Sequence, residues 1–470
     1  MPSRLKSASP RSPRQGTHGR AAAFDRDHAL AGTKAEPMQN RATQSAPRAG
    51  LLKRLAAGAS ARLDLISTAL SNGGMQLSGV VTGVILARSL GVEGRGQLAM
   101  AMLWPIILAA AGSLGIPQAV VYFSARHRCP IGLMLWQCYL LAMLQAVILM
   151  GAGHFLVPVL LRGQTAVLCS AAKLFLWLIP LNLVTQPGIS ALQGQLRMKQ
   201  FNWMRLSGNG IYVVGLVGLY ACGALTVYSA LMVLLVTNVA TAALSVTYVS
   251  LVFGCEMRVD RGLMKELLYY GLRIHAGTVS PLLNQRLDQM LISLFLSPSQ
   301  LGLYAVAATV SAAAEPMASA FSLMAFPRAA RGGPDARAFG RSSRLGLFSI
   351  VAGGSCLFVA APAAIHLCFG RDFAAAAPVC RILVIASILR TCRGLAGAVL
   401  SGLNRPGVSS KAEVLSLFLS LGMFFALLPS YGIVGAAVAS TLANAGAVIY
   451  VWRCAEFGHR ATSEEVDALT

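Results

Sequence analysis

The sequence predicts an all-α polytopic membrane protein with about 12 transmembrane helices in two parallel six-helix bundles. Hydrophobic residues make up 56% of the 470 residues and charged residues only 12%, whereas soluble domains carry about 25% charged residues. From Leu65 to Tyr450, apolar runs recur that are each long enough to cross a hydrocarbon core of ~30 Å as a helix. The two halves of this region also resemble one another, which predicts the two bundles.

Short polar loops separate the predicted spans. Because backbone groups in lipid must form their hydrogen bonds within the segment itself, each span is expected to be a helix. The predicted ranges are 65–87, 98–122, 131–157, 166–192, 207–224, 228–253, 272–296, 301–326, 345–369, 374–401, 410–429 and 431–452.

The segments outside the spans complete the predicted domain organisation. Residues 1–60 are rich in Arg, Ser, Ala and Pro without an amphipathic period, and predict a disordered, basic cytoplasmic tail. Met38 is an alternative start of translation. The predicted order is the tail at 1–60, an N-terminal bundle at 61–255, a cytoplasmic linker at 256–271, a C-terminal bundle at 272–455 and a short cytoplasmic tail at 456–470.

The net charge of +22 is explained by topology, and no nucleic-acid partner is expected. With the N-terminus in the cytoplasm, the inner loops carry most of the Lys and Arg residues between the spans, as the positive-inside rule requires. We therefore expect a multi-pass protein of the cell inner membrane with both termini cytoplasmic. The outer loops carry only Arg88, Arg95, Arg162 and Arg371.

Sites of enzymatic chemistry are not expected. The ten cysteines are scattered singly, without the spacing of a metal site or a disulfide framework. The sequence also contains no nucleophile elbow and no phosphate loop, so no catalytic residue, metal or cofactor is predicted.

An internal repeat predicts that the halves are related by an axis along the membrane normal. At a shift of 206 residues, Leu90 matches Leu296 and Gly96 matches Gly302, and Asn238 matches Asn444 in the last span of each half. Six spans in each half make the repeat parallel. Parallel repeats of this kind are typical of transporters, with a substrate site near the midplane between the halves.

Five segments occur in order between residues 60 and 455: ILARSLGVEGRGQLAMA, LGIPQAVVYFSAR, RLDQMLISLFLSPSQLGLYAVA, AFPRAAR and YGIVGAAVAS. In order and spacing, these segments resemble Wzx-type polysaccharide flippases of the multidrug/oligosaccharidyl-lipid/polysaccharide exporter superfamily. The resemblance implies transfer of an oligosaccharide linked to undecaprenyl pyrophosphate from the cytoplasmic to the periplasmic leaflet by alternating access. It also implies membrane lipids, a glycan polymerase and co-polymerase, and a coupling cation as partners.

Other functions stay open. A lipid II-type flippase usually has fourteen helices, and a multidrug transporter has signatures less like these segments. A membrane glycan polymerase would carry a larger periplasmic loop than any loop here. A scaffold without transport activity would leave the charges within the spans unexplained.

Polar residues at mid-depth of span 272–296 are candidates for the substrate site. Ionisable groups in the bilayer are costly and usually face a cavity or a partner helix. Asn284, Gln285 and Arg286 are expected to bind the pyrophosphate or sugar, and Asp288 a coupling cation or sugar hydroxyls. An interhelical ion pair is the structural alternative.

Two further spans carry candidate residues. Arg390 and Arg393, three apart in span 374–401, share a face with Gly394 and Gly397, and a guanidinium suits phosphate oxygens. Both arginines are predicted to bind substrate. Glu315 directly precedes Pro316 in span 301–326. It is predicted to act in ion coupling at a hinge, and pairing with one of the arginines is the alternative.

The topology gives a first testable prediction. Reporter fusions after Arg128, Lys199, Arg261 and Arg337 should report the cytoplasm. Fusions near Arg95, Gly223 and Ser299 should report the periplasm. Inverted signals at two or more of these sites would contradict the twelve-span topology.

Overall fold

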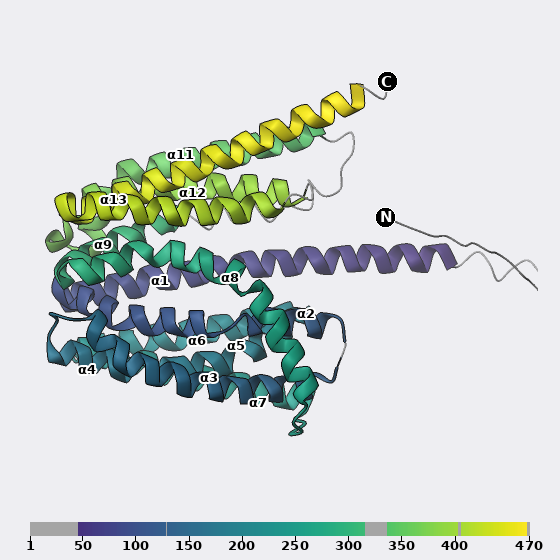
Figure 1. The fold of residues 1–470 in the computed structure, drawn as a ribbon, viewed down its shortest axis with the longest axis horizontal. Helices are drawn as coiled ribbons and strands as arrows, with labels where there is room; N and C mark the ends of the chain where they lie inside the picture. The colour runs from purple at the N-terminus through teal and green to yellow at the C-terminus, as the bar shows by residue number, and fades with distance from the viewer. Residues whose placement is uncertain (1–45, 128, 315–335, 403–405, 468–470) are drawn as a thin grey trace, which may run out of the picture. The chain divides into compact units, whose positions relative to one another are not determined.

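The computed structural model describes residues 46–127, 129–314, 336–402 and 406–467, and its regular elements there are helices (Figure 1). The chain divides into two compact units, Met1–Gly58 and Ala59–Thr470. Helix α1 (Ala46–Gly112) begins in the first unit, and the helices after it belong to the second.

The start of α1 differs from the predicted tail. Residues 46–60 were expected to be disordered, but they are helical. This stretch is rich in Ala and Leu, which favour helix more strongly than the Pro- and Ser-rich sequence before it. The rest of the predicted tail, residues 1–45, lies outside the described residues.

The second unit contains the following helices after α1: α2 (Ile116–Ala125), α3 (Ile131–Leu160), α4 (Ala166–Phe175), α5 (Leu178–Gly194), α6 (Met198–Ala221), α7 (Val227–Phe253), α8 (Arg261–Phe295), α9 (Pro298–Ser311), α11 (Ala336–Phe369), α12 (Ala376–Gly402) and α13 (Pro406–Asp467). Two short 3₁₀ turns, Ala312–Ala314 and Arg371–Phe373, follow α9 and α11.

The longest helix, α1, contains span 65–87 and the first part of span 98–122, and α13 contains spans 410–429 and 431–452. Within α1 the helical path breaks at Gly91, where φ is 68°, and within α13 it breaks at Gly432, where φ is 54°. A side chain at either position would resist this left-handed conformation. Six helical stretches of the described chain are long and apolar enough to cross a membrane, and Ile66–Gly112 and Gly407–Cys454 are the two that contain these breaks.

Two predicted spans are interrupted by turns. Span 98–122 continues from α1 into α2 through Gly115, and span 166–192 consists of α4 and α5. The second break lies just before Pro180, which lacks the N–H for a helical bond and clashes with the preceding turn. Of span 301–326, only the part in α9 and the 3₁₀ turn after it is described.

The helices pack in two groups. Helices α2 to α7 contact one another, and α8, α9, α11, α12 and α13 contact one another (Figure 1). Large apolar side chains point outward from both groups: Phe155 of α3 is 78% exposed, Leu251 of α7 81% and Phe418 of α13 67%. Exposed apolar surface on this scale requires a hydrocarbon environment. The fold is therefore that of an all-α polytopic membrane protein.

The repeat-related glycines of the two halves touch each other. A Cβ on Gly96 of α1 would lie 1.7 Å from the Pro298 carbonyl oxygen, and a Cβ on Gly302 of α9 would lie 2.1 Å from the Val92 carbonyl oxygen. Val92 and Pro298 are themselves related by the shift of 206 residues. Gly96 approaches Pro298, the counterpart of Val92, and Gly302 approaches Val92 itself. Such reciprocal contacts are characteristic of a two-fold axis.

A second repeat-related pair has the same local geometry. The Asn238 amide donates to the Leu234 carbonyl in α7, and the Asn444 amide donates to the Ser440 carbonyl in α13. Both bonds run four residues back along the helix. The match predicted from sequence therefore extends to side-chain conformation.

Helix α8 connects the two groups. Its first half packs on α2, where Tyr270 stacks on Tyr122 with ring centroids 4.3 Å apart. Its second half packs on α9 and α13. Asp260 caps the helix by accepting from the backbone N–H groups of Gly262 and Leu263, and buried Gln137 of α3 binds the segment before it.

The contact between α1 and α9 gives a prediction about stability. Gly96→Ala should destabilise the protein by about 1–3 kcal/mol or more, because the added methyl group overlaps backbone atoms that cannot move independently. Thermal unfolding of the detergent-purified protein measures this effect. Gly79→Ala on the same helix is the matched control, since a Cβ there meets nothing within 4 Å. Equal unfolding temperatures for both variants would contradict the prediction.

Candidate functional site

A cavity of about 490 Å³ lies among the second half of α8, α12 and α13. Its charged lining residues, within the described chain, are Arg390, Arg393 and Glu413. The remaining lining residues are Pro281, Leu282, Asn284, Gln285, Gly394, Gly397, Ser409 and Asn444. Four of the five residues predicted to bind substrate therefore line one cavity: Asn284, Gln285, Arg390 and Arg393.

The position of the cavity differs from the sequence-based expectation. A site between the two halves was expected, but the lining side chains come from α8, α12 and α13. The small residues Gly394 and Gly397 leave space beside the two arginines. A Cβ on Gly397 would come within 2.6 Å of the Ser409 hydroxyl oxygen, so this glycine allows α12 and α13 to approach closely.

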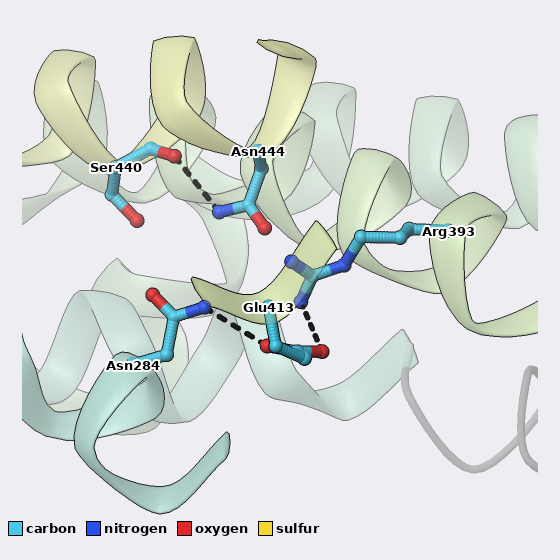
Figure 2. Close-up of polar contacts among 5 residues, drawn as sticks. All are labelled: Asn284, Arg393, Glu413, Ser440 and Asn444. Carbon is cyan, nitrogen blue, oxygen red and sulfur yellow. Dashed lines mark hydrogen bonds and ion pairs between the residues drawn. The ribbon is translucent and has the colours of Figure 1, made fainter. Parts of the chain in front are cut away.

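An ion pair in the cavity lining connects α12 and α13. Arg393 Nη2 lies 2.9 Å from Glu413 Oε1, and the Asn284 amide donates to Glu413 Oε2 at 3.0 Å (Figure 2). One carboxylate thus joins side chains of three helices. The Arg393 side chain is only 8% exposed, whereas the Glu413 side chain is 26% exposed.

Two buried donors at the cavity have no hydrogen-bond partner among the described residues. They are Arg393 Nη1 and the Ser409 hydroxyl. Buried polar groups are nearly always satisfied, so each such group requires an explanation. Both atoms are covered by neighbouring groups, so an acceptor oxygen of a ligand would reach them only after a neighbouring side chain has moved.

Arg286 and Asp288, which were predicted to act in the site, lie outside the cavity lining. Arg286 Nη1 donates to Gln289 Oε1 at 3.1 Å on the same helix. Asp288 accepts from the Tyr304 hydroxyl of α9 and from the Gln289 backbone N–H. The two charged side chains do not bond to each other, and both contact Gln289, Arg286 through the side-chain oxygen and Asp288 through the backbone N–H. Asp288 also interacts electrostatically with Arg390 and Arg286.

The other predicted coupling residue, Glu315, lies outside the described residues. Asp288, by contrast, has a defined environment. Its contact with Tyr304 connects α8 to α9, and Tyr304 is fully buried. This carboxylate therefore belongs to the packing between two helices as well as to the charge pattern around the cavity.

Glu413, Ser409 and Asn444 are site residues that the sequence analysis missed. A signal for Glu413 exists, since Asp288, Glu315 and Glu413 are the acids within the predicted spans. Its position near the start of span 410–429 resembles that of an interfacial residue. For Asn444 the signal is its repeat match with Asn238.

No cluster of three or more His, Cys, Asp or Glu residues that could hold a metal ion occurs in the described parts of the chain. The chemistry of the cavity is that of two guanidinium groups, one carboxylate, three amides and a hydroxyl. This set can bind and release an anionic or hydroxyl-rich ligand, because it offers several hydrogen-bond donors around a net positive charge.

The fold defines a class of membrane protein. It matches the inward-closed lipid II flippase MurJ with a TM-score of 0.69 at 14% identity, covering 84% of this chain and 87% of that chain. It also matches an inward-facing multidrug resistance MATE family transporter of the MOP superfamily with a TM-score of 0.68 at 15% identity, covering 83% of this chain and 96% of that one. At such low sequence identity, these structural matches show a shared fold alone.

Within this class the family is defined by sequence. The chain belongs to the polysaccharide biosynthesis protein family, which matches residues 63–332. It is 28% identical over 165 residues to the probable low-salt glycan biosynthesis flippase Agl15 of Haloferax volcanii. That match spans 34% of this chain and about a third (35%) of the relative's length. The predicted resemblance to proteins of polysaccharide biosynthesis is confirmed by this family match.

The ion pair gives a prediction about abundance. Removing Arg393 leaves the Glu413 carboxylate without its charged partner in an apolar helix, which is destabilising. Arg393→Ala should therefore lower the amount of protein in the membrane, and adding Glu413→Ala should restore it. Quantitative immunoblotting of membranes measures both. Full abundance of the single variant would show that Arg393 and Glu413 do not stabilise the fold as a pair.

Proposed function

We propose that this protein is a flippase that moves an oligosaccharide linked to undecaprenyl pyrophosphate from the cytoplasmic to the periplasmic leaflet. The product would serve exopolysaccharide, capsule or O-antigen biosynthesis. The observation that carries the proposal is the arginine-lined cavity within apolar helices of a polysaccharide biosynthesis family member.

The chemistry of the cavity suits an anionic lipid-linked sugar. A guanidinium presents two parallel donors that match phosphate oxygens, and such contacts strengthen in surroundings of low dielectric constant. The amides of Asn284, Gln285 and Asn444 can bind sugar hydroxyls. Charged groups within spans usually face a pathway for polar substrates, and the position of Arg390 and Arg393 in the cavity lining supports such a role.

We propose alternating access between the bundles 61–255 and 272–455, connected by the linker 256–271. The close approach of Gly96 and Gly302 on the pseudo-two-fold axis supports rigid-body motion of each half about a shared contact. Helix α8 packs on one group with its first half and on the other with its second, so it would bend or rotate during this motion. Asp288 and Glu315 remain the proposed coupling residues.

The proposed location is the inner membrane with both termini in the cytoplasm, and the support is the excess of Lys and Arg in the predicted inner loops. A glycan polymerase and a co-polymerase would receive the product on the outer side. A lipid II-type substrate or a drug is the second candidate, because MurJ and MATE transporters share the fold. The match to a glycan flippase favours the oligosaccharide.

Complementation of a strain that lacks this gene tests the proposal. Arg390→Ala should reduce surface glycan more than tenfold at normal membrane abundance, because a charge-assisted contact contributes about 1.5–3 kcal/mol. Arg390→Lys should be intermediate, since lysine keeps the charge and loses the fork. Lipid-linked oligosaccharide should accumulate in the deletion strain.

Arg381→Ala is the matched control for Arg390→Ala. Arg381 lies on the same helix but packs over the Phe358 ring at 5.5 Å and does not line the cavity. Its variant should export glycan at the wild-type level. Wild-type export by a well-expressed Arg390→Ala protein would contradict the anion site. Altered drug susceptibility without a change in glycan would favour the multidrug alternative.

A further inference from the structure

We propose that Glu413 is a built-in competitor for the anionic part of the substrate. Its carboxylate occupies donors of the cavity when the site is empty, and an oxyanion of the substrate displaces it on binding. This inference rests on the proposed function, because it assigns a role to a residue of the same cavity.

The geometry of Glu413 is that of a bound oxyanion. Its two carboxylate oxygens are held separately, Oε1 by Arg393 Nη2 at 2.9 Å and Oε2 by the Asn284 amide at 3.0 Å (Figure 2). A phosphate or a sugar carboxylate presents the same edge of two oxygens about as far apart. Arg393 and Asn284 therefore form a cradle that either group could fill.

Donors beside the cradle remain unused. Arg393 Nη1 and the Ser409 hydroxyl are buried without a hydrogen-bond partner among the described residues, and both side chains line the cavity. Glu413 engages one nitrogen of the guanidinium fork. An anion that takes both nitrogens would form a bidentate pair, which is the stronger arrangement.

Competition follows from charge and from exposure. A second anion beside Glu413 would be repelled strongly in surroundings of low dielectric constant. The Arg393 side chain is 8% exposed and the Glu413 side chain 26% exposed, so Glu413 is the less tightly enclosed of the two partners. Glu413 is therefore the partner that moves.

This arrangement explains both selection and release. Neutral and cationic molecules cannot replace a carboxylate on Arg393, so the site selects anions. When the substrate leaves, Glu413 takes its place, and Arg393 is not left as an unpaired charge in the membrane. Release thus avoids part of the cost of exposing the empty site.

The test compares Glu413→Gln with wild-type full-length protein in nanodiscs, using inorganic pyrophosphate and glucuronate as separate probes in titration calorimetry. Glutamine keeps the size and one acceptor but removes the charge. We expect affinity for at least one probe to rise about tenfold or more, since a charge-assisted contact is regained without competition. A gain confined to pyrophosphate assigns the cradle to the phosphate end of the substrate, and a gain confined to glucuronate assigns it to an acidic sugar.

A control variant and a second readout separate competition from simple support of the fold. Glu93→Gln makes the same change at an exposed residue whose carboxylate is bound by Gln97, and it should leave affinity unchanged. Glycan export by Glu413→Gln should fall although binding tightens, because release is slowed. If Glu413 only positions Arg393, binding and export fall together, and that result would overturn the proposal.

If the glutamine variant does not fold, Glu413→Asp serves as a second variant. Aspartate retains the charge but reaches Arg393 less well, so competition predicts that the probe binds more tightly than to wild type, by less than tenfold. A lower affinity than that of wild type would overturn the proposal. Failure of the proposed function would give a different result from failure of the competition model. It would appear as intact surface glycan in the deletion strain, whatever the binding measurements give.

Discussion

The close approach of α1 and α9 at Gly96 and Gly302 is the constraint on which the rest of the structure depends. The backbones come so near that neither position has room for a Cβ. Small residues allow this distance, and in membranes van der Waals contact of this kind replaces the hydrophobic effect as the force between helices. Nearby, Arg88 of α1 donates to the carbonyls of Leu367 and Cys368 at the end of α11, which otherwise lack helical partners.

The helices of this fold follow from hydropathy because lipid leaves the backbone little choice. The repeat also follows from the sequence, since Gly96 and Gly302 occupy matching positions and then meet in space. The helix boundaries follow from the sequence only in part. Gly91 breaks α1 inside the predicted polar loop that contains Arg88 and Arg95, whereas the turn before Pro180 lies inside one apolar run, so no polar loop marks it.

The site was predictable to the extent that its charges lie within spans. Arg390, Arg393, Asn284 and Gln285 line one cavity because their helical spacing places them on inward faces. Their partners depend on packing between helices distant in sequence. Glu413 lies 129 residues from Asn284, and Asp288 is satisfied by Tyr304 of the next helix. A single sequence contains no signal that pairs Arg393 with Glu413 and not with Asp288.

The balance of charge around the cavity connects this structure to its function. Among the described lining residues, two arginines face one glutamate, so the wall carries a net positive charge within apolar helices. A charge in such surroundings is costly unless it is paired or solvated. Replacing Glu413 by a substrate anion with more than one negative charge would neutralise the wall more completely than the glutamate can. Arg393 Nη1 and the Ser409 hydroxyl, which lack a hydrogen-bond partner among the described residues, also favour a ligand that brings acceptor oxygens. The positive charge of this wall therefore favours the anionic, lipid-linked sugar that we propose as the substrate.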